Sequence, residues 1–193
     1  MGPVQLWALV ALLVATRQVL SRTRIRIAPK FHGIWTCPAE LNHFTTIFNY
    51  SVGMDANGLD VMNVDGRIDR KIMTVSKFDL LVHRCQAGMS NDNCEYFFNW
   101  SWKNGCCNLL AQKGVFYSPI LDSISPPFIC PMDKYFYTLR NSTMNIDEIG
   151  AIMSSMALEN WVWKGQFQVW NEKRELVVCA YVIGDLRRYK VKN

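Results

Sequence analysis

Large apolar side chains occupy every second position in several segments of the chain, which is the pattern of β-strands with one buried face. The alternation is clearest over residues 48–52, 77–83 and 166–170, and a compact aromatic run covers 96–102. A nearly continuous apolar run over 176–183 is typical of a strand that is buried on both faces. The polar stretch 171–175 between the last two segments predicts a hairpin turn.

Helical periodicity is confined to two places. Asn145 can cap a helix with Glu148 three residues later, and Ile146, Ile149 and Met153 then share one face with Met156. A shorter helical turn is expected over 107–112. Without a repeat or a linker in the chain, these elements predict an all-β fold: an antiparallel β-sandwich or β-cup with an apolar cavity and one or two short helices.

The first 21 residues have the pattern of a targeting segment. Leu6 to Ala15 is an uninterrupted apolar run, shorter than the roughly 20 residues of a membrane span but within the range of a signal core. We therefore predict a signal peptide over 1–21, with cleavage after Ser21, and a single secreted domain over 22–193. An uncleaved anchor is the alternative, because no Lys or Arg precedes the core and Arg17 follows it.

Two further features agree with export to the extracellular space. Asn49, Asn99 and Asn141 each begin an Asn-x-Ser/Thr acceptor for N-glycosylation. All seven cysteines follow residue 21 and none has C-x-x-C spacing, so we interpret them as a disulfide framework and expect neither a metal nor a cofactor.

Composition and motifs argue against several classes of function. The chain has no G-x-S-x-G, H-E-x-x-H or glycine-rich phosphate motif, and its three histidines lie far apart. His83, between apolar strand residues and Arg84, is interpreted as structural. We predict a protein that is not an enzyme. The net charge of +5 does not predict nucleic-acid binding, and the basic stripes near both ends imply peripheral membrane contact at most.

The unusual feature is the load of aromatic and methionine side chains, with 10 Phe, 7 Trp, 7 Tyr and 9 Met. One interpretation is core filling, for which these residues are well suited. The other is a cavity for a hydrophobic ligand such as a hydrocarbon, fatty ester or lipid. The residues predicted to line that cavity are Phe48, Phe78, Trp163, Phe167 and Val169, with Ile149, Met153 and Met156 near its mouth.

The order of the cysteine motifs is more specific than any one of them. The motifs are Trp35-Thr36-Cys37, Cys85-x8-Cys94, Cys106-Cys107-Asn108-Leu109-Leu110, Cys130-Pro131 before a Tyr-rich strand, and Cys179 near the end. From Trp35 to Ile183 this set resembles the GM2-activator-like, MD-2-related lipid-recognition proteins, and among them the insect CheA/CheB-type chemosensory proteins.

The resemblance implies a β-cup with an apolar cavity, no catalytic centre and lipid-like ligands. For the insect branch it implies secretion and a role in detecting contact pheromones. It also implies three disulfides: Cys37 with Cys179, Cys85 with Cys94, and Cys107 with Cys130. The activator pattern has eight cysteines, so one of the seven here stays unpaired or pairs between chains; Cys106 is nominated, with Cys107 the alternative.

Three functions follow as hypotheses. The first is a secreted binder of hydrophobic ligands that acts in contact chemosensation. The second is an extracellular cofactor that presents lipid to an enzyme or a receptor. The third is a module without a cavity that binds an ion channel or receptor directly.

Overall fold

The computed structural model describes residues 24–38, 41–86, 93–115, 117–144, 146 and 160–191. Within them the chain forms the following elements: β1 (Arg24–Thr36), β2 (Thr45–Met54), β3 (Asp60–Ile68), β4 (Val75–Cys85), β5 (Cys94–Trp102), α2 (Cys106–Ala111), α3 (Ser118–Asp122), β6 (Ile124–Ser125), β7 (Tyr135–Ser142), β8 (Val162–Asn171) and β9 (Leu176–Val191). The residues of the predicted signal peptide and most of the predicted helix over 145–156 lie outside the described residues.

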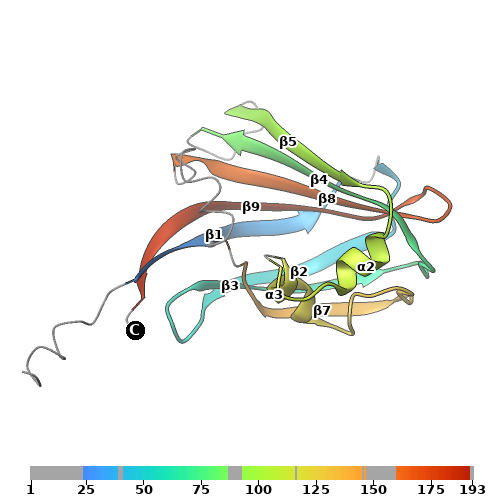
Figure 1. Ribbon diagram of the computed structural model, residues 1–193, viewed down its shortest axis with the longest axis horizontal. Helices are drawn as coiled ribbons and strands as arrows, with labels where there is room; N and C mark the ends of the chain where they lie inside the picture. The colour runs from blue at the N-terminus through green and yellow to red at the C-terminus, as the bar shows by residue number, and fades with distance from the viewer. Residues whose placement is uncertain are drawn as a thin grey trace, which may run out of the picture.

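The strands form two antiparallel sheets that lie one above the other (Figure 1). The larger sheet has the order β1-β9-β8-β4-β5 and the smaller one β2-β3-β7-β6. The predicted all-β sandwich is thereby confirmed. The predicted turn over 171–175 joins β8 to β9, and the helical turn expected over 107–112 is α2.

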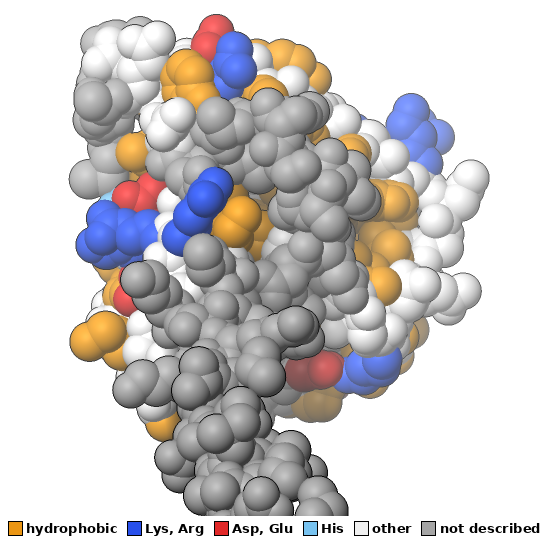
Figure 2. Space-filling model, turned by 60° about the vertical axis from the view of Figure 1, so that its left-hand side comes forward, with side chains coloured by type: hydrophobic (Ala, Val, Ile, Leu, Met, Phe, Trp, Pro, Cys, Tyr) orange, Lys and Arg blue, Asp and Glu red, His pale blue; other side chains and the backbone are white. Residues whose placement is uncertain are grey.

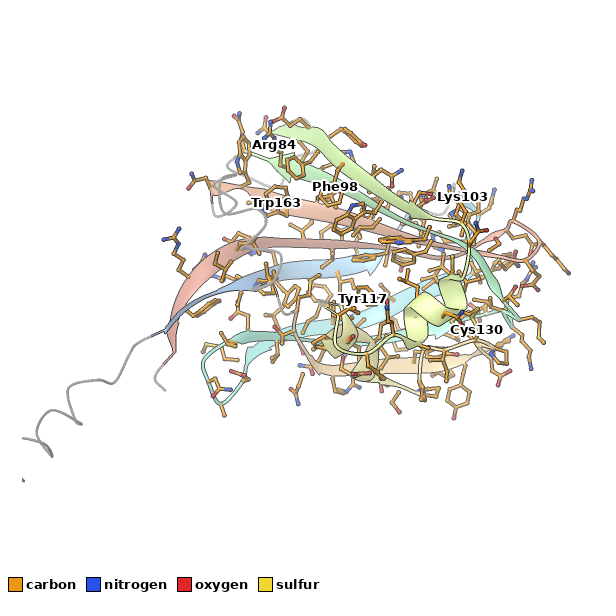
Figure 3. The ribbon with its side chains drawn as sticks, viewed as in Figure 1. Arg84, Phe98, Lys103, Tyr117, Cys130 and Trp163 are labelled. Atoms are coloured by element: carbon orange, nitrogen blue, oxygen red, sulfur yellow. A yellow bond between two sulfur atoms is a disulfide. The ribbon has the colours of Figure 1, made fainter. Side chains whose placement is uncertain are left out.

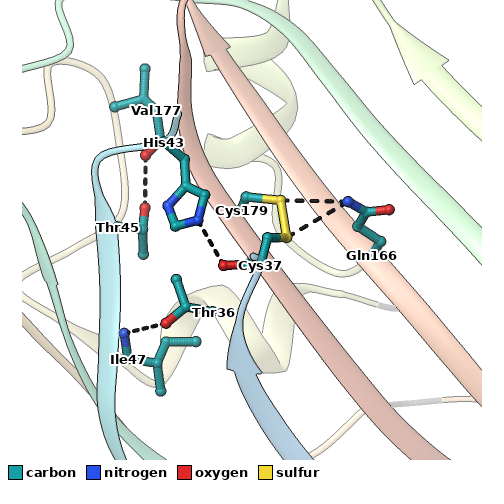
Figure 4. The surroundings of a disulfide bond; sticks show 8 residues. All are labelled: Thr36, Cys37, His43, Thr45, Ile47, Gln166, Val177 and Cys179. Atoms are coloured by element: carbon teal, nitrogen blue, oxygen red, sulfur yellow. Dashed lines mark hydrogen bonds between the residues drawn. A yellow bond between two sulfur atoms is a disulfide. The ribbon is translucent and has the colours of Figure 1, made fainter. Parts of the chain in front are cut away.

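The sheets are joined along the side where β1 and β2 meet. The backbone N–H of Ile47 donates to Thr36 Oγ1 at 2.8 Å, and the Thr45 hydroxyl donates to the Val177 carbonyl at 2.7 Å (Figure 4). On the other side, α2 and α3 lie between the edge strand β5 and the lower sheet (Figure 1). One long side is thus closed by strands and the other by short helices.

The best-packed part of the core lies between α2 and the start of β9. Ile72 and Val177 are fully buried there, and Met132 is 1% exposed. An isolated β-bridge between Ile72 and Met132 ties the β3–β4 connection to the segment before β7. The core around these residues is therefore tightly packed.

Three disulfides cross-link the described chain: Cys37–Cys179, Cys85–Cys94 and Cys107–Cys130. They are the pairs that the resemblance implies. Gln166 Nε2 lies 3.6 Å from both sulfurs of the Cys37–Cys179 bond (Figure 4). Cys106 is free and buried. Three disulfides are compatible with an extracellular protein.

Candidate functional site

The register of the larger sheet places rows of apolar side chains on its inner face. Phe78 of β4 pairs with Val169 of β8, and the alternation then brings Leu80 opposite Phe167 two residues further along. Residues directly opposite on one face contact each other, and β5 extends each row with a tryptophan or phenylalanine. From the packed end outward, the rows are Val178, Val169, Phe78 and Trp102; Ala180, Phe167, Leu80 and Trp100; and Val182, Gly165, Val82 and Phe98.

An inner cavity of about 210 Å³ lies between these rows, the smaller sheet and the two helices. The larger sheet contributes Phe78 and Phe167 to its wall, the smaller sheet Met62 and Leu139, and α3 Ile120. Apart from Tyr117, the described lining side chains are apolar. Such a wall favours hydrocarbon over water, since a buried water needs two to four polar partners.

An outer cavity of about 180 Å³ adjoins the inner one. The two have five lining residues in common: Phe31, Leu80, Met144, Phe167 and Val182. The outer wall is completed mainly by aromatic side chains of β5 and β8, among them Phe98 and Trp163, which lie toward the same end of the sheet in Figure 3. The two cavities are therefore compartments of one apolar space, with Phe167 at their junction.

Two glycines on the inner face help to form the outer compartment, because each omits a side chain from a row of large ones. A Cβ at Gly165 would lie 3.3 Å from Val182 Cγ1 and 3.7 Å from atoms of Leu80 and Phe167. A Cβ at Gly184 would lie 2.6 Å from the Lys30 carbonyl oxygen. Gly184 is therefore required by the close approach of β1. A Cβ at Gly165 would press on the Val182 side chain, so the glycine keeps this part of the outer wall free of a side chain.

Burial raises the pKa of two titratable groups at or near the inner cavity, Tyr117 and Cys106. The Tyr117 hydroxyl donates to the Leu109 carbonyl at 3.0 Å, and burial raises the pKa of this phenol, which stays protonated at neutral pH. Burial also raises the pKa of the Cys106 thiol, whose sulfur lies 3.4 Å from the Trp102 carbonyl. A thiol held in its protonated form is a poor nucleophile.

Four of the residues predicted to contact a ligand lie on the cavity walls. Phe78 and Val169 line the inner compartment, Trp163 lines the outer one, and Phe167 lines both. Ile149, Met153 and Met156 lie outside the described residues.

The prediction for Phe48 is wrong. Its side chain is 56% exposed and packs against Phe136, with 6.1 Å between ring centroids. The cause is a register shift between Ile47 and Asn49 that makes Phe48 an extra residue in β2. A bulge of this kind interrupts the strict alternation of faces on which the prediction depended.

Sequence reasoning missed the walls that other elements supply. Leu80 lies in a recognised alternating segment and could have been chosen with Phe78. Gly165, a glycine among large side chains in β8, was a further sequence signal for a cavity wall, because a glycine inside a strand often marks the close approach of a ligand or another backbone. Met62 and Leu139 carried no such signal, because they line the cavity only through the stacking of the second sheet.

The three glycosylation acceptors are exposed and do not line either compartment. Asn49 lies in β2 opposite Asp65, to which its Nδ2 donates at 3.2 Å. Asn99 lies in the edge strand β5, and Asn141 lies near the end of β7.

No family model matches this chain. A search of curated proteins likewise finds no significant match. In the part of the chain that the structure describes, no group of three His, Cys, Asp or Glu side chains is arranged to hold a metal ion. None of the described helices has the length and apolarity needed to cross a membrane.

Proposed function

We propose that the protein is an extracellular, non-enzymatic binder of hydrophobic, lipid-like ligands. The observation that supports this proposal is the two-compartment apolar space between the sheets, of about 210 and 180 Å³. Ligand pockets are mostly apolar, with a few polar groups that set orientation.

The size of the space suits an acyl chain. An apolar cavity of about 150 Å³ holds benzene, so the two compartments together have room for roughly 15 heavy atoms. Burial contributes about 0.8 kcal/mol per CH2, or roughly 12 kcal/mol for such a chain. Association costs of at least about 4 kcal/mol leave enough for micromolar affinity, which requires about 8 kcal/mol.

A role in contact chemosensation is the more specific form of this proposal. It is supported by the resemblance of the cysteine framework to the insect chemosensory proteins, and by three disulfides that suit an oxidising compartment. Cuticular hydrocarbons, fatty esters and related lipids are the ligand classes that this role implies, with a chemosensory receptor or ion channel as the partner.

A second candidate is a cofactor that presents lipid to an enzyme or receptor. It is favoured by apolar side chains on the outside of the molecule, where Phe48 and Phe136 are each more than half exposed and Arg67 lies 5.7 Å from the Phe136 ring. Exposed apolar clusters of this kind often mark contact surfaces.

Ligand titration followed by tryptophan fluorescence tests the proposal. Trp102 and Trp163 line the two compartments, so methyl palmitate or hexadecanol should change the emission in a saturable way. Phe167→Asp should weaken binding by about tenfold or more, because it places a carboxylate at the junction of the compartments.

Phe48→Asp is the matched control, since the same substitution on the exposed face should leave binding unchanged. Absence of a saturable response in the wild-type protein, with its three disulfides formed, would contradict the proposal. Equal binding by Phe167→Asp would instead show that the ligand binds elsewhere.

A further inference from the structure

Arg84 occupies the next inner-face position beyond the outer compartment. In β4 it follows Phe78, Leu80 and Val82 at intervals of two residues, and it pairs with Trp163 of β8. Two residues of a strand span about 6.8 Å, so the start of the Arg84 side chain lies one row beyond the row of Val82 and Gly165. A cation thus follows directly on a series of apolar positions.

The guanidinium group of Arg84 lies against the aromatic rings at this end. Its central carbon is 4.8 Å from the Trp161 ring centroid and 5.6 Å from that of Phe97. Phe97 packs edge-on against Trp163 at 5.0 Å, and both line the outer compartment. Figure 3 shows Arg84 close to Trp163 and Phe98, at the opposite end of β5 from Lys103.

Arg84 keeps hydrogen-bonding capacity for a ligand. In the described part of the chain its hydrogen-bond partner is Glu95, which accepts from Nε at 2.7 Å, so the two terminal NH2 groups remain as donors. The side chain is 36% exposed. Figure 2 brings this end of the molecule forward and shows basic side chains beside hydrophobic ones at the surface.

Two other described charges near this end, Asp185 and Lys164, are directed to other partners. Asp185 lines the same compartment, but its carboxylate lies 3.3 Å from Arg187 and 3.5 Å from His32. The neighbouring cation Lys164 pairs with His83 in the register and so lies on the opposite face, 4.6 Å from the Tyr181 ring.

We infer that Arg84 binds the anionic head group of a single-chain amphiphile whose apolar chain lies in the two compartments. This inference rests on the proposed function and narrows its ligand class from any hydrophobic compound to lipids with a carboxylate, sulfate or phosphate head. A guanidinium held between rings is pre-organised for such a group and binds it through two parallel N–H donors. A neutral hydrocarbon has neither a charge nor an acceptor with which to bind the guanidinium group.

The test compares palmitate with methyl palmitate, which share a chain and differ in head-group charge. The wild-type protein should bind palmitate more tightly than the ester. Arg84→Gln should weaken palmitate binding by about tenfold and leave the ester unchanged. Lys103→Gln, which removes an exposed charge from the other end of β5, should change neither. Acetate in excess should not displace palmitate, since a free anion lacks the chain.

A second variant gives an independent readout. Glu95→Gln removes the carboxylate that Arg84 holds and should tighten palmitate binding without affecting the ester. Equal palmitate affinities for the wild-type protein, Arg84→Gln and Glu95→Gln would overturn the inference while leaving the proposed function standing. Displacement of palmitate by acetate would also overturn it, since the site would then bind a free anion. Failure of both ligands to bind the wild-type protein would instead contradict the proposed function.

Discussion

At the scale of single residues, the shape of the apolar space depends on where side chains are missing as much as on where they are large. Gly165 stands in a row with Val82 and Val182. Two residues further along β8, on the same face, Phe167 lines both compartments. A glycine inside a strand weakens the strand. Here it leaves space that a ligand can occupy.

Gly165→Val should fill part of the outer compartment. The new side chain would displace ligand carbons, each of which contributes about 0.8 kcal/mol. We expect the affinity for palmitate or its ester to fall by about tenfold or more, and the affinity for octanol, which fits the inner compartment, to change little. Fluorescence titration measures both.

Gly53→Val is the control, because a Cβ at Gly53 meets only Val61 Cγ2, at 4.0 Å. It should leave both affinities as they are. An unchanged palmitate affinity in Gly165→Val would show that the chain does not enter the outer compartment.

His83 should make the stability of the protein depend on pH. Burial and the charge of Lys164 lower the pKa of His83 below its usual 6.5. The imidazole of His83 therefore binds a proton more readily in the unfolded chain than in the folded one. The stability associated with neutral His83 is present above about pH 6.5 and is lost as the pH falls through the lower folded-state pKa.

We expect the urea midpoint of the wild-type protein to fall more steeply between about pH 7.5 and about pH 5 than that of His83→Gln. Carboxylates with lowered pKa values, such as Asp65, titrate below this window and do not mask the effect. Parallel curves for the two proteins would contradict the assignment.

At the scale of elements, bulges and cross-links decide which faces the strands present. The register shift in β2 exposes Phe48, and a shift between Val82 and His83 makes Phe97 an extra residue in β5.

The Cys37–Cys179 bond joins the residue after β1 to β9, near the hydrogen bonds that link the sheets. One disulfide and two hydrogen bonds thus connect the strands on the side where the two sheets are joined.

Loss of Cys37–Cys179 should destabilise the protein more than loss of Cys85–Cys94. The sequence separations are 142 and 9 residues, for which the chain-entropy model gives about 5 and about 2.5 kcal/mol. Urea unfolding of the two double variants, Cys37→Ala with Cys179→Ala and Cys85→Ala with Cys94→Ala, measures the difference. A larger loss in the second variant would show that native-state contacts outweigh the loop-closure contribution.

At the scale of the whole molecule, the apolar space lies between the sheets and the glycosylation acceptors lie away from it. The side chains of Asn49, Asn99 and Asn141 are exposed and line neither compartment. Sugars on these positions would cover strand surfaces outside the cavity. Glycosylation and ligand binding should therefore be independent.

We expect secreted protein to lose apparent mass on treatment with an N-glycosidase, and the treated protein to bind palmitate as before. Gel mobility and fluorescence titration measure the two effects. Secreted material whose mobility the enzyme does not change would contradict the predicted glycosylation. A changed affinity would show that a glycan reaches the cavity mouth.

The amino-acid sequence by itself determined the fold class, the strand-rich order of elements, the β8–β9 turn and the short helix α2, because each depends on the spacing of residues close together in the chain. It also indicated Phe78, Phe167 and Val169 as inward-facing residues, since the alternation in β4 and β8 is regular around them. The tertiary structure decided the rest. A one-residue bulge moved Phe48 to the surface, and the stacking of the sheets brought Met62 and Leu139 to the cavity wall. The pairing of β4, β8 and β9 placed Gly165 in the wall of the outer compartment and Arg84 one row beyond it. These features depend on contacts between segments far apart in the chain, which local periodicity does not encode.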